Sequence, residues 1–534
     1  MAARESDAPG LPPGICNLIA GRRIVVASNR GPVEFHRDPG GRLTTKRGSG
    51  GVVTALASLA ASLPLTWVAA TMSEGDRAAF PDASAPAREV RLGYIPLRVR
   101  YVAIPPEVYA RHYDTISNQV LWFLQHYLWD LANSPTFTER EYTAWDEGYR
   151  AVNFAIAQAV ADELLAADGT GKRRQRPEDG SDAIVLLQDY HLYLAAAFLR
   201  QRLPRAIIQQ FIHIPWPSVR YWRFLPQRFL TEIYEGLAAN DALGFQTERD
   251  ARAFLECARA LLPGCRVDLD EGRLLWRRHR LVAHAYPVTA DADEIRRTLH
   301  STPARRGADE LAPFMGTGVK VIVRVDRIEP TKNIVRGLQA YELLLRRYPE
   351  LHGKVRHLAF LVPSRQGLAV YRRYEREVRR TIQRINERFG TPEWQPVKAF
   401  FENNRARALA ALRRYDVLLV NAVIDGMNLV AKEGALANSH DGVIVLSRTA
   451  GAYIQMADAV LPVTSTDLEE TADQLYEALT MSESERRRRW ERARDIVASD
   501  TLAGWIADQL RDAVLTHPQR LGTARGAALA RVRS

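Results

Sequence analysis

The chain is 534 residues long, with 46% hydrophobic and 25% charged residues and a formal net charge of +11. Because a single hydrophobic core stops growing well below this length, we expect two domains with a cleft between them. The composition is that of a globular protein and excludes a chain that is disordered throughout. The positive charge suits nucleic acid or phosphorylated small substrates, and by itself it does not choose between them.

Two basic runs, Lys172–Arg176 and Arg486–Arg489, are the candidates for nucleic-acid binding. The first lies in a Gly/Pro/Asp-rich loop. The second is flanked by Glu483, Glu485 and Glu491 at helical spacing, as on a solvated helix face. Neither run is accompanied by an aromatic ladder, so we expect no nucleic-acid partner.

The cysteine pattern and the apolar runs bear on the compartment. Cys16, Cys257 and Cys265 form no zinc-type pairs, which is typical of a reducing compartment. The N-terminus lacks the apolar core of a signal peptide, and no apolar run approaches the ~18 residues of a membrane span. We therefore expect a cytoplasmic protein without a membrane partner, and leave a homo-oligomer open.

The first half of the chain alternates short apolar runs with helical patterns. Residues 22–28 are predicted as a buried strand, followed by a hairpin over 33–47, a glycine loop at Gly48–Gly51 and an apolar helical stretch. Further strands are predicted at 183–188, 206–212 and 242–245. This alternation favours a mostly parallel α/β sheet.

The same pattern restarts near residue 319 and predicts a second α/β domain. A strand over 319–326 precedes a helix over 333–348 and a strand over 357–363. After a long charged helix, strands are predicted at 416–420 and 441–447. The amphipathic stretch from Glu483 to about Val514 is predicted to be the last structured part of the fold.

Ligands of open α/β sheets bind beyond the carboxyl ends of the strands, and three candidates follow the early strands. Arg30 with Gly50 and Gly51 could bind a phosphate, because glycines at a helix start let backbone N–H groups approach an anion, or could form a plain tight turn. Asp189 and His213 each follow a strand. Either could be catalytic, a helix cap or a satisfied core residue.

Two further candidates follow strands of the second domain. Arg327 and Lys332 lie five residues apart on a proline-constrained turn and could clamp a diphosphate, unless they are ordinary surface charges. Asp425 and Gly426 precede a helical segment whose first backbone N–H groups are free to bind a ligand. Glu433 in the same segment could accept hydrogen bonds from ribose hydroxyls. The Asp-x-Asp stretches at 268–270 and 291–293 lack further clustered ligands, so we expect neither a metal site nor a cofactor.

Taken together, eight motifs in this order and spacing resemble the trehalose-phosphate synthase family of retaining glycosyltransferases over residues 22 to about 512. The motifs are SNRGPV (28–33), GSGGVVTAL, SNQVLW (117–122), QDYHL, HIPWPS (213–218), GFQT (244–247), VDRIEPTKN and DGMNLVAKE. The resemblance implies the GT-B fold, an α/β architecture of two Rossmann-like domains facing across a cleft. It also implies a nucleotide-sugar donor and a sugar-phosphate acceptor as partners.

The resemblance also implies roles for individual residues. The implied catalytic residues are Arg327, Lys332, Asp189 and His213. The implied donor-binding residues are Gly50, Gly51, Arg327, Lys332, Asp425, Gly426, Met427, Asn428, Leu429, Val430 and Glu433. The implied acceptor-binding residues are Arg30, Tyr113, Trp122, Asp189 and Arg365. By the same resemblance, attack occurs on the front face and needs no enzyme nucleophile.

The domain boundaries follow from pattern and resemblance together. We expect a flexible start (1–20), an acceptor-binding domain (21–290), a linker (291–317), a nucleotide-sugar-binding domain (318–498), a C-terminal helix (499–516) that could pack back on the first domain, and a flexible tail (517–534).

The motifs depart from the family pattern at several positions. Glu329, Pro330 and Asn333 stand in a turn that is usually Leu-Asp-Tyr-x-Lys-Gly, Ile424 replaces an arginine, and Ala70 stands where a tryptophan is expected. Pro330 and Asn333 are similar to validoxylamine phosphate synthase, which couples pseudo-sugars. We expect glucose transfer from UDP- or GDP-glucose to glucose 6-phosphate. A cyclitol phosphate or glycerol phosphate acceptor and a non-catalytic nucleotide-sugar sensor stay open.

Overall fold

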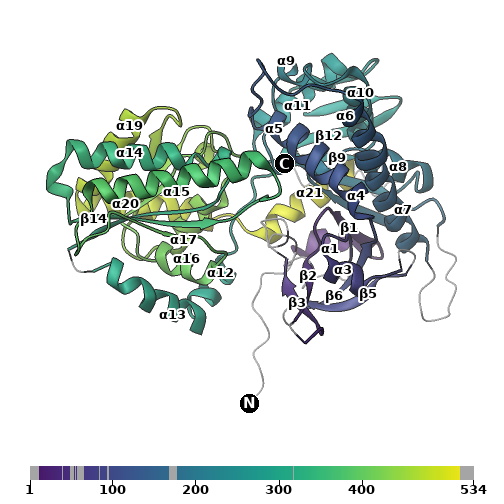
Figure 1. Cartoon of the computed structure of the whole chain (residues 1–534). Helices are drawn as coiled ribbons and strands as arrows, with labels where there is room; N and C mark the ends of the chain where they lie inside the picture. The colour runs from purple at the N-terminus through teal and green to yellow at the C-terminus, as the bar shows by residue number, and fades with distance from the viewer. Residues whose placement is uncertain are drawn as a thin grey trace. The chain divides into compact units, whose positions relative to one another are not determined.

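The computed structural model describes residues 11–38, 40–48, 65–82, 85–92, 95–166, 177–316 and 318–517, together with Val53, Leu56 and Ala60. Residue contacts divide the described chain into two compact units (Figure 1). The first unit runs to Pro287 and includes the residues from Leu502 onward, and the second is Val288–Thr501.

Among the described residues, ten strands of the first unit form one sheet in the order β10-β11-β12-β9-β8-β7-β1-β4-β6-β5. Its strands are β1 Arg23–Ser28, β4 Leu65–Ala70, β5 Arg88–Leu92, β6 Ile95–Val102, β7 Ala183–Gln188, β8 Ile207–Phe211, β9 Ala242–Phe245, β10 Arg266–Asp268, β11 Arg273–Trp276 and β12 His279–Ala285. The run from β12 to β6 is parallel, while β10, β11 and β5 pair antiparallel at the edges. A separate hairpin joins β2 Val33–Arg37 to β3 Leu43–Arg47.

Helices of the first unit connect these strands. They are α1 Pro13–Ile19, α3 Glu74–Ala79, α4 Pro106–Ala110, η1 Arg111–Trp122, α5 Phe123–Gln125, α6 Glu139–Ala144, η2 Trp145–Arg150, α7 Ala151–Leu165, η3 Tyr190–Leu192, α8 Ala195–Arg202, α9 Val219–Trp222, α10 Gln227–Ala238, α11 Glu248–Leu261 and α21 Leu502–Thr516. η1 and η2 are π-helical, a geometry that is frequent at functional sites.

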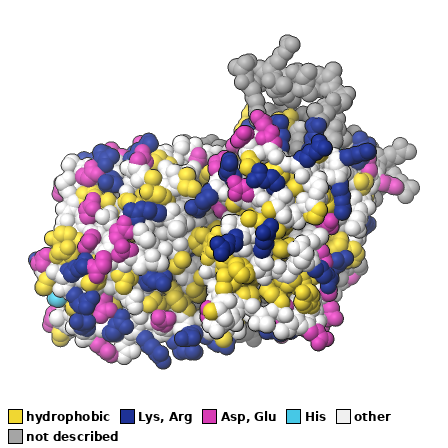
Figure 2. Space-filling model, turned by 90° about the horizontal axis from the view of Figure 1, so that it is seen from above, with side chains coloured by type: hydrophobic (Ala, Val, Ile, Leu, Met, Phe, Trp, Pro, Cys, Tyr) yellow, Lys and Arg dark blue, Asp and Glu magenta, His cyan; other side chains and the backbone are white. Residues whose placement is uncertain are grey.

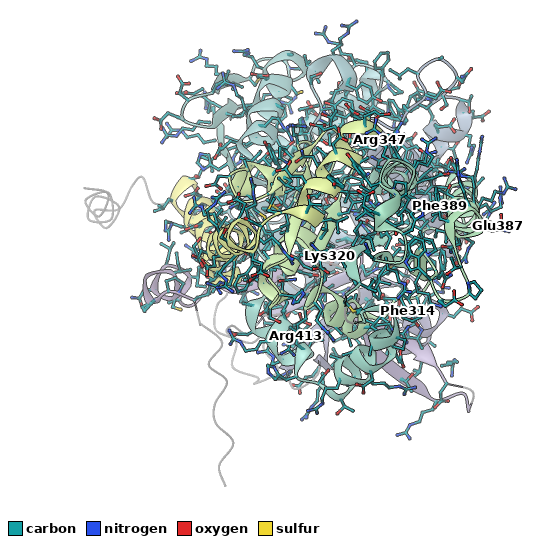
Figure 3. All side chains as sticks on the ribbon, turned by 90° about the vertical axis from the view of Figure 1, so that its left-hand side faces the viewer. Phe314, Lys320, Arg347, Glu387, Phe389 and Arg413 are labelled. Atoms are coloured by element: carbon teal, nitrogen blue, oxygen red, sulfur yellow. The ribbon has the colours of Figure 1, made fainter. Side chains whose placement is uncertain are left out.

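The described part of the second unit has six parallel strands in the order β15-β14-β13-β16-β17-β18. They are β13 Lys320–Arg327, β14 Val355–Val362, β15 Val397–Phe400, β16 Val417–Val420, β17 Val443–Ser447 and β18 Leu461–Val463. The helices are α12 Ala292–Leu299, α13 Thr302–Leu311, η4 Ala312–Phe314, η5 Pro330–Lys332, α14 Ile334–Arg347, η6 Pro349–Leu351, α15 Ala369–Phe389, α16 Arg405–Leu412, α17 Leu429–Ala437, α18 Gly451–Met456, α19 Leu468–Thr480 and α20 Glu483–Ala498. Figure 3 shows this unit, with Lys320 at the start of β13 and Phe389 at the end of α15.

Both sheets follow the strand order of a Rossmann fold, because each is built outward in both directions from its first strand. The order reverses between β1 and β7 in the first unit and between β13 and β16 in the second. Buried aliphatic residues such as Val26 and Ile322 fill these central strands, which are covered on both faces. Each reversal is a topological switch point, where ligands of such folds bind.

The predicted strands and the hairpin form as expected, while other predictions need revision. The expected linker 291–317 instead carries α12 and α13, which pack on α16 and α17 within the second unit. The amphipathic stretch after Glu483 is two helices, α20 and α21. The C-terminal helix expected over 499–516 corresponds to α21, which belongs to the first unit. The sequence patterns missed β4 and β6, and the predicted helix after Gly51 falls largely outside the described residues.

The charged surface is mixed in sign. On the face shown in Figure 2, Lys and Arg side chains are interspersed with Asp and Glu. The arginine run on α20 is paired: Arg486 contacts Asp416, Arg487 contacts Asp441, and the next two arginines contact Glu485. Within the described residues, no helix has the length and apolar character needed to cross a bilayer.

Candidate active site

The predicted cations lie at the switch point of the second sheet. Arg327 is the last residue of β13, and Lys332 ends the 3-10 turn η5 that follows. Asp425 follows the neighbouring strand β16, and its carboxylate Oδ2 forms an ion pair with Lys332 Nζ. Burial acts to lower the pKa of Lys332, but the carboxylates of Asp425 and Asp326 outweigh it and raise the pKa above its usual value. Lys332 is therefore a fixed cation at neutral pH.

A buried arginine that the sequence patterns did not single out holds this turn in place. The side chain of Arg324 is fully buried in β13, and its Nε donates to Asp326 Oδ2 at 2.8 Å. Its Nη2 donates to the Lys332 carbonyl at 2.8 Å and to Asn421 Oδ1 at 2.7 Å. A Cβ at Gly337 would lie 2.2 Å from Arg324 Nη1, so the glycine makes room for the guanidinium. The only hint in the sequence was a charge inside an apolar strand.

Arg327 and Arg365 approach one shared carboxylate. Arg327 Nη1 lies 3.4 Å and Arg365 Nη1 3.7 Å from Glu329 Oε1. The side chain of Arg327 is 52% exposed, so a ligand can reach it from solvent. The structure therefore places Arg365, predicted on the acceptor side, beside the predicted donor cation Arg327.

The turn after β16 and the start of α17 form a backbone cradle. Asn428 adopts a left-handed conformation (φ 72°), caps α17 through Ala431 N, and donates from Nδ2 to Asp425 Oδ2 at 3.1 Å. Gly426 and Met427 are buried, whereas Leu429 and Val430 are half-buried and begin the helix. Backbone N–H groups in the first turn of a helix have no partner within the helix and can donate to an anion.

Glu433 lies one turn further along α17 and is already paired. Arg405 Nη1 donates to Glu433 Oε1 at 3.0 Å, while Nη2 of the same arginine donates to Glu294 Oε2 at 2.7 Å. Burial raises the pKa of Glu433, and Arg405 offsets part of that rise. The sequence patterns missed Arg405 and Glu294. Arg405 lies 28 positions from Glu433 and 111 positions from Glu294 along the chain.

Asp189 and His213 lie side by side beyond β7 and β8 of the first unit. Asp189 has a φ of 70°, and its Oδ1 accepts from His213 N at 3.2 Å. His213 Nε2 lies 3.1 Å from Gln188 Oε1, and Nδ1 lies 3.4 Å from Gln246 Nε2. Loss of solvation lowers the pKa of His213 to about 3. The imidazole is therefore neutral, with Nε2–H donating to Gln188 and Nδ1 accepting from Gln246.

Arg30, Tyr113 and Trp122 border one chain of aromatic rings in the first unit. Arg30 follows β1, and its Nη1 lies 3.3 Å from Glu34 Oε1. The neighbouring Asn29 donates from Nδ2 to Tyr109 Oη at 2.9 Å. The ring contacts then run from Tyr109 through Tyr113, His191 and Tyr190 to Trp122, with centroids 3.9 to 5.8 Å apart. The structure thus brings these three predicted residues to the same strand ends as Asp189.

Gly50, Gly51 and Ala70 are the remaining positions that the sequence singles out on the first unit. Gly50 and Gly51 lie outside the described residues. Ala70 is fully buried at the end of β4, where it pairs with Val102. The nearby indole of Trp67 is also buried and donates to Ser28 Oγ at 2.7 Å.

The two Asp-x-Asp stretches have structural roles. Asp268 accepts from Asp270 N and Glu271 N at 3.1 Å each, and Asp291 caps α12 through Glu294 N. Within the part of the chain that the structure describes, no group of three or more His, Cys, Asp or Glu residues could hold a metal ion.

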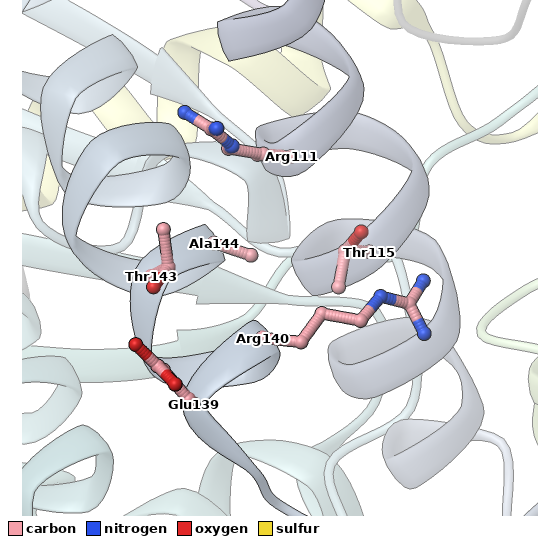
Figure 4. Close-up of a pocket in the computed structure, with 6 residues that line it drawn as sticks. All are labelled: Arg111, Thr115, Glu139, Arg140, Thr143 and Ala144. Atoms are coloured by element: carbon pink, nitrogen blue, oxygen red, sulfur yellow. The ribbon is translucent and has the colours of Figure 1, made fainter.

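Two surface cavities of the first unit lie apart from the predicted site residues. One, of about 440 Å³, is lined by Arg111 and Thr115 of η1 and by Glu139, Arg140, Thr143 and Ala144 of α6 (Figure 4). The other, of about 1160 Å³, lies among α11, β10 to β12 and α21. Neither is lined by a residue predicted to act in the site.

Two Rossmann-like units with charged side chains at their switch points define a protein of the GT-B class. The chain belongs to glycosyltransferase family 20, whose model matches residues 22–514, and is an enzyme of the glycosyltransferase class. The family predicted from the motifs is thereby confirmed, as is the fold class.

Three similar proteins illustrate the range within the family. The UDP-forming alpha,alpha-trehalose-phosphate synthase A of Dictyostelium discoideum is 30% identical over 490 residues, 90% of this chain and 61% of that protein. This chain thus spans about three fifths of that relative's length. A validamine 7-phosphate valienyltransferase of Streptomyces hygroscopicus subsp. jinggangensis is 29% identical over 510 residues, 95% of this chain and 97% of that protein. The UDP-forming synthase of Burkholderia xenovorans, solved with glucose-6-phosphate, superposes with a TM-score of 0.74 at 26% identity and covers 92% of this chain and 99% of its own.

Proposed function

We propose that this enzyme transfers glucose from a nucleotide-glucose donor to glucose 6-phosphate with retention of configuration, forming trehalose 6-phosphate. The observation that carries the proposal is the Arg327 and Lys332 pair at the switch point of the second sheet. UDP-glucose is the favoured donor, since the similar synthases are named as UDP-forming. GDP-glucose remains the alternative nucleotide.

The donor residues act through charge and backbone geometry. In the transition state the glucose carries oxocarbenium character, and two negative charges grow on the leaving diphosphate. We assign Arg327, Lys332 and the N–H groups from Gly426 to Val430 to the stabilisation of those charges. The family resemblance adds Gly50 and Gly51 to the donor-binding residues. Glu433 binds the ribose, while Asp425 and His213 orient the donor sugar. Because burial lowers the pKa of His213 to about 3, we assign the neutral imidazole a role in positioning rather than in proton transfer.

The acceptor residues bind the phosphate and orient the attacking hydroxyl. We assign Arg30, Tyr113, Trp122 and Arg365 to the sugar phosphate and Asp189 to the acceptor hydroxyls. The bond from glucose C1 to the leaving phosphate oxygen breaks as the bond from C1 to the acceptor oxygen forms on the same face. The acceptor proton passes to the leaving diphosphate oxygen, so no enzyme nucleophile is needed.

A cyclitol phosphate is the second candidate acceptor. Pro330 starts η5, and Asn333 adopts a left-handed conformation (φ 57°) and donates to Asn421 O at 2.9 Å. Pro330 and Asn333 are the residues on which the sequence resembles pseudo-sugar-coupling members of the family. A relative named for validamine 7-phosphate also aligns over nearly the full length of both chains. A changed acceptor leaves the cationic donor site unaltered.

A matrix of donors and acceptors tests the proposal. UDP-glucose and GDP-glucose are each combined with glucose 6-phosphate, glycerol 3-phosphate and a cyclitol phosphate, and released nucleoside diphosphate and phosphorylated product are measured. We expect the fastest transfer from UDP-glucose to glucose 6-phosphate, unchanged by a metal chelator. Faster transfer to a cyclitol phosphate would select the second candidate. Donor binding without transfer to any acceptor would instead indicate a sensor and overturn both.

A further inference from the structure

Glu329 makes one carboxylate oxygen available to two arginines. Its Oε1 accepts from Ser364 Oγ at 2.8 Å and lies 3.4 Å from Arg327 Nη1 and 3.7 Å from Arg365 Nη1. Arg327 ends β13, and Arg365 follows the neighbouring strand β14. Glu329 therefore joins the ends of two parallel strands through opposite charges.

The carboxylate is buried and ionised. Its side chain has no exposed surface, and its second oxygen, Oε2, has no hydrogen-bond partner among the described residues. Burial alone would raise the pKa of Glu329, but Arg327, Arg365 and Lys332 outweigh it and lower the pKa to about 2. A permanent negative charge is thus enclosed among three cations that would otherwise repel one another.

The backbone at Arg365 has an unusual conformation. Its φ of 44° lies in the left-handed region, which a side chain with a Cβ rarely adopts. Nη1 donates to Tyr371 Oη at 2.6 Å, and the side chain is only 8% exposed. Strained backbone at a buried cation persists where the surroundings fix it, as at ligand-binding positions.

We propose that Glu329 is a positioning residue that holds Arg327 and Arg365 together in the orientation in which they bind phosphate groups. This inference rests on the proposed function, in which Arg327 meets the donor diphosphate and Arg365 the acceptor phosphate. One buried carboxylate then orders a cation for each substrate. A guanidinium has five N–H donors in a planar fork, so one arginine can contact a carboxylate and a phosphate at the same time.

Kinetics of Glu329→Gln test the proposal, because glutamine keeps the shape and removes the charge. We expect the Michaelis constants for donor and acceptor each to rise about tenfold, since hydrogen bonds to charged groups are of this strength. Glu375→Gln is the matched control, because it removes a half-buried carboxylate that pairs with Arg379 on α15 of the same unit, away from the predicted site residues. Unchanged constants, or a rise for one substrate alone, would overturn the proposal.

A double-mutant cycle separates positioning from a general loss of structure. When Glu329→Gln is added to Arg365→Ala, we expect the Michaelis constant for the donor to rise. The Michaelis constant for the acceptor should stay equal to that of Arg365→Ala alone. A further rise in the acceptor constant would assign the effect to structural damage. If Glu329→Gln does not fold by circular dichroism, Glu329→Asp takes its place. The shorter carboxylate should raise both constants together, and an unchanged constant contradicts the inference.

Binding measurements distinguish failure of this inference from failure of the proposed function. Calorimetry with UDP and with inorganic phosphate is carried out on the unmodified chain and on Glu329→Gln. Weaker binding of both ligands to the variant supports the positioning role even when no acceptor is turned over. Equal binding to the two proteins overturns the role even when the unmodified chain forms trehalose 6-phosphate.

Discussion

Lys332 Nζ and Asp425 Oδ2 form an ion pair that links the ends of β13 and β16 at the switch point of the second sheet. Asn428 Nδ2 donates to the same carboxylate oxygen, and Arg324 holds the Lys332 carbonyl. The ammonium is thus fixed in place before any ligand arrives. Preorganised charge of this kind is the main way in which enzymes stabilise growing negative charge.

Lys332→Ala should therefore lower kcat by about 10²- to 10³-fold, as the loss of one preorganised donor does in other enzymes. Initial rates of nucleoside diphosphate release measure the change. Lys354→Ala is the control, because Lys354 is exposed in the loop before β14 of the same unit. Near-normal turnover by Lys332→Ala would refute the role assigned to this lysine.

Gly451→Ala should disrupt the turn that carries Asp425 and Gly426. A Cβ at Gly451 would lie 1.8 Å from the Gly426 carbonyl oxygen, so the backbone must shift. We expect kcat/KM for the donor to fall by about tenfold or more, in line with the usual cost of overpacking. Gly316→Ala is the matched control, since a Cβ there meets nothing within 4 Å. Equal effects of the two substitutions would show that this turn does not set donor affinity.

His213 should contribute no titration to the reaction near neutral pH. Its pKa is lowered to about 3, so the ring stays neutral between pH 5 and 8. His213→Gln should lower kcat/KM by about tenfold, because the amide replaces only part of the hydrogen bonding. The ratio of unmodified to variant kcat/KM, measured across that range, should stay constant. A ratio that changes through a transition near pH 6.5 would contradict the neutral imidazole.

His284 and Asp512 should make the first unit more stable at lower pH. His284 Nδ1 lies 2.8 Å from Asp512 Oδ2 and joins β12 to α21, and this bond raises the pKa of His284. Because the folded state binds the proton more tightly, the stabilisation is full below the unfolded pKa of about 6.5 and is lost as pH rises through the folded pKa.

The thermal unfolding midpoint of Asp512→Asn measures this effect against the unmodified chain. Asp512→Asn should lower the unfolding midpoint more at pH 5.5 than at pH 8.5. Asp508→Asn, which removes a carboxylate paired with Arg511 on the same helix, should change the midpoint equally at both pH values. An equal loss at both pH values would exclude a contribution from protonated His284.

Much of the fold was predictable because local patterns carry it. The runs at 183–188 and 242–245 match β7 and β9 residue for residue, since short β-branched and aliphatic runs favour buried strands. β4 and β6 were missed, and charged positions such as Arg98 and Arg100 interrupt the apolar pattern of β6. The composition of α12 and α13 lacks a strong apolar period, so the pattern predicts a linker where the structure has two helices.

The sequence by itself determined the family, the parallel α/β architecture and the residue types at the ends of the strands. Only the tertiary structure decided which side chains share a partner. Glu329 contacts Arg327 two positions away and Arg365 far along the chain, and Arg405 joins Glu294 to Glu433. No periodicity records such contacts, because they depend on where the ends of separate strands and helices meet in space. The motifs predict Arg327 and Lys332 as cations, and the packing around Glu329 and Asp425 fixes where those charges lie.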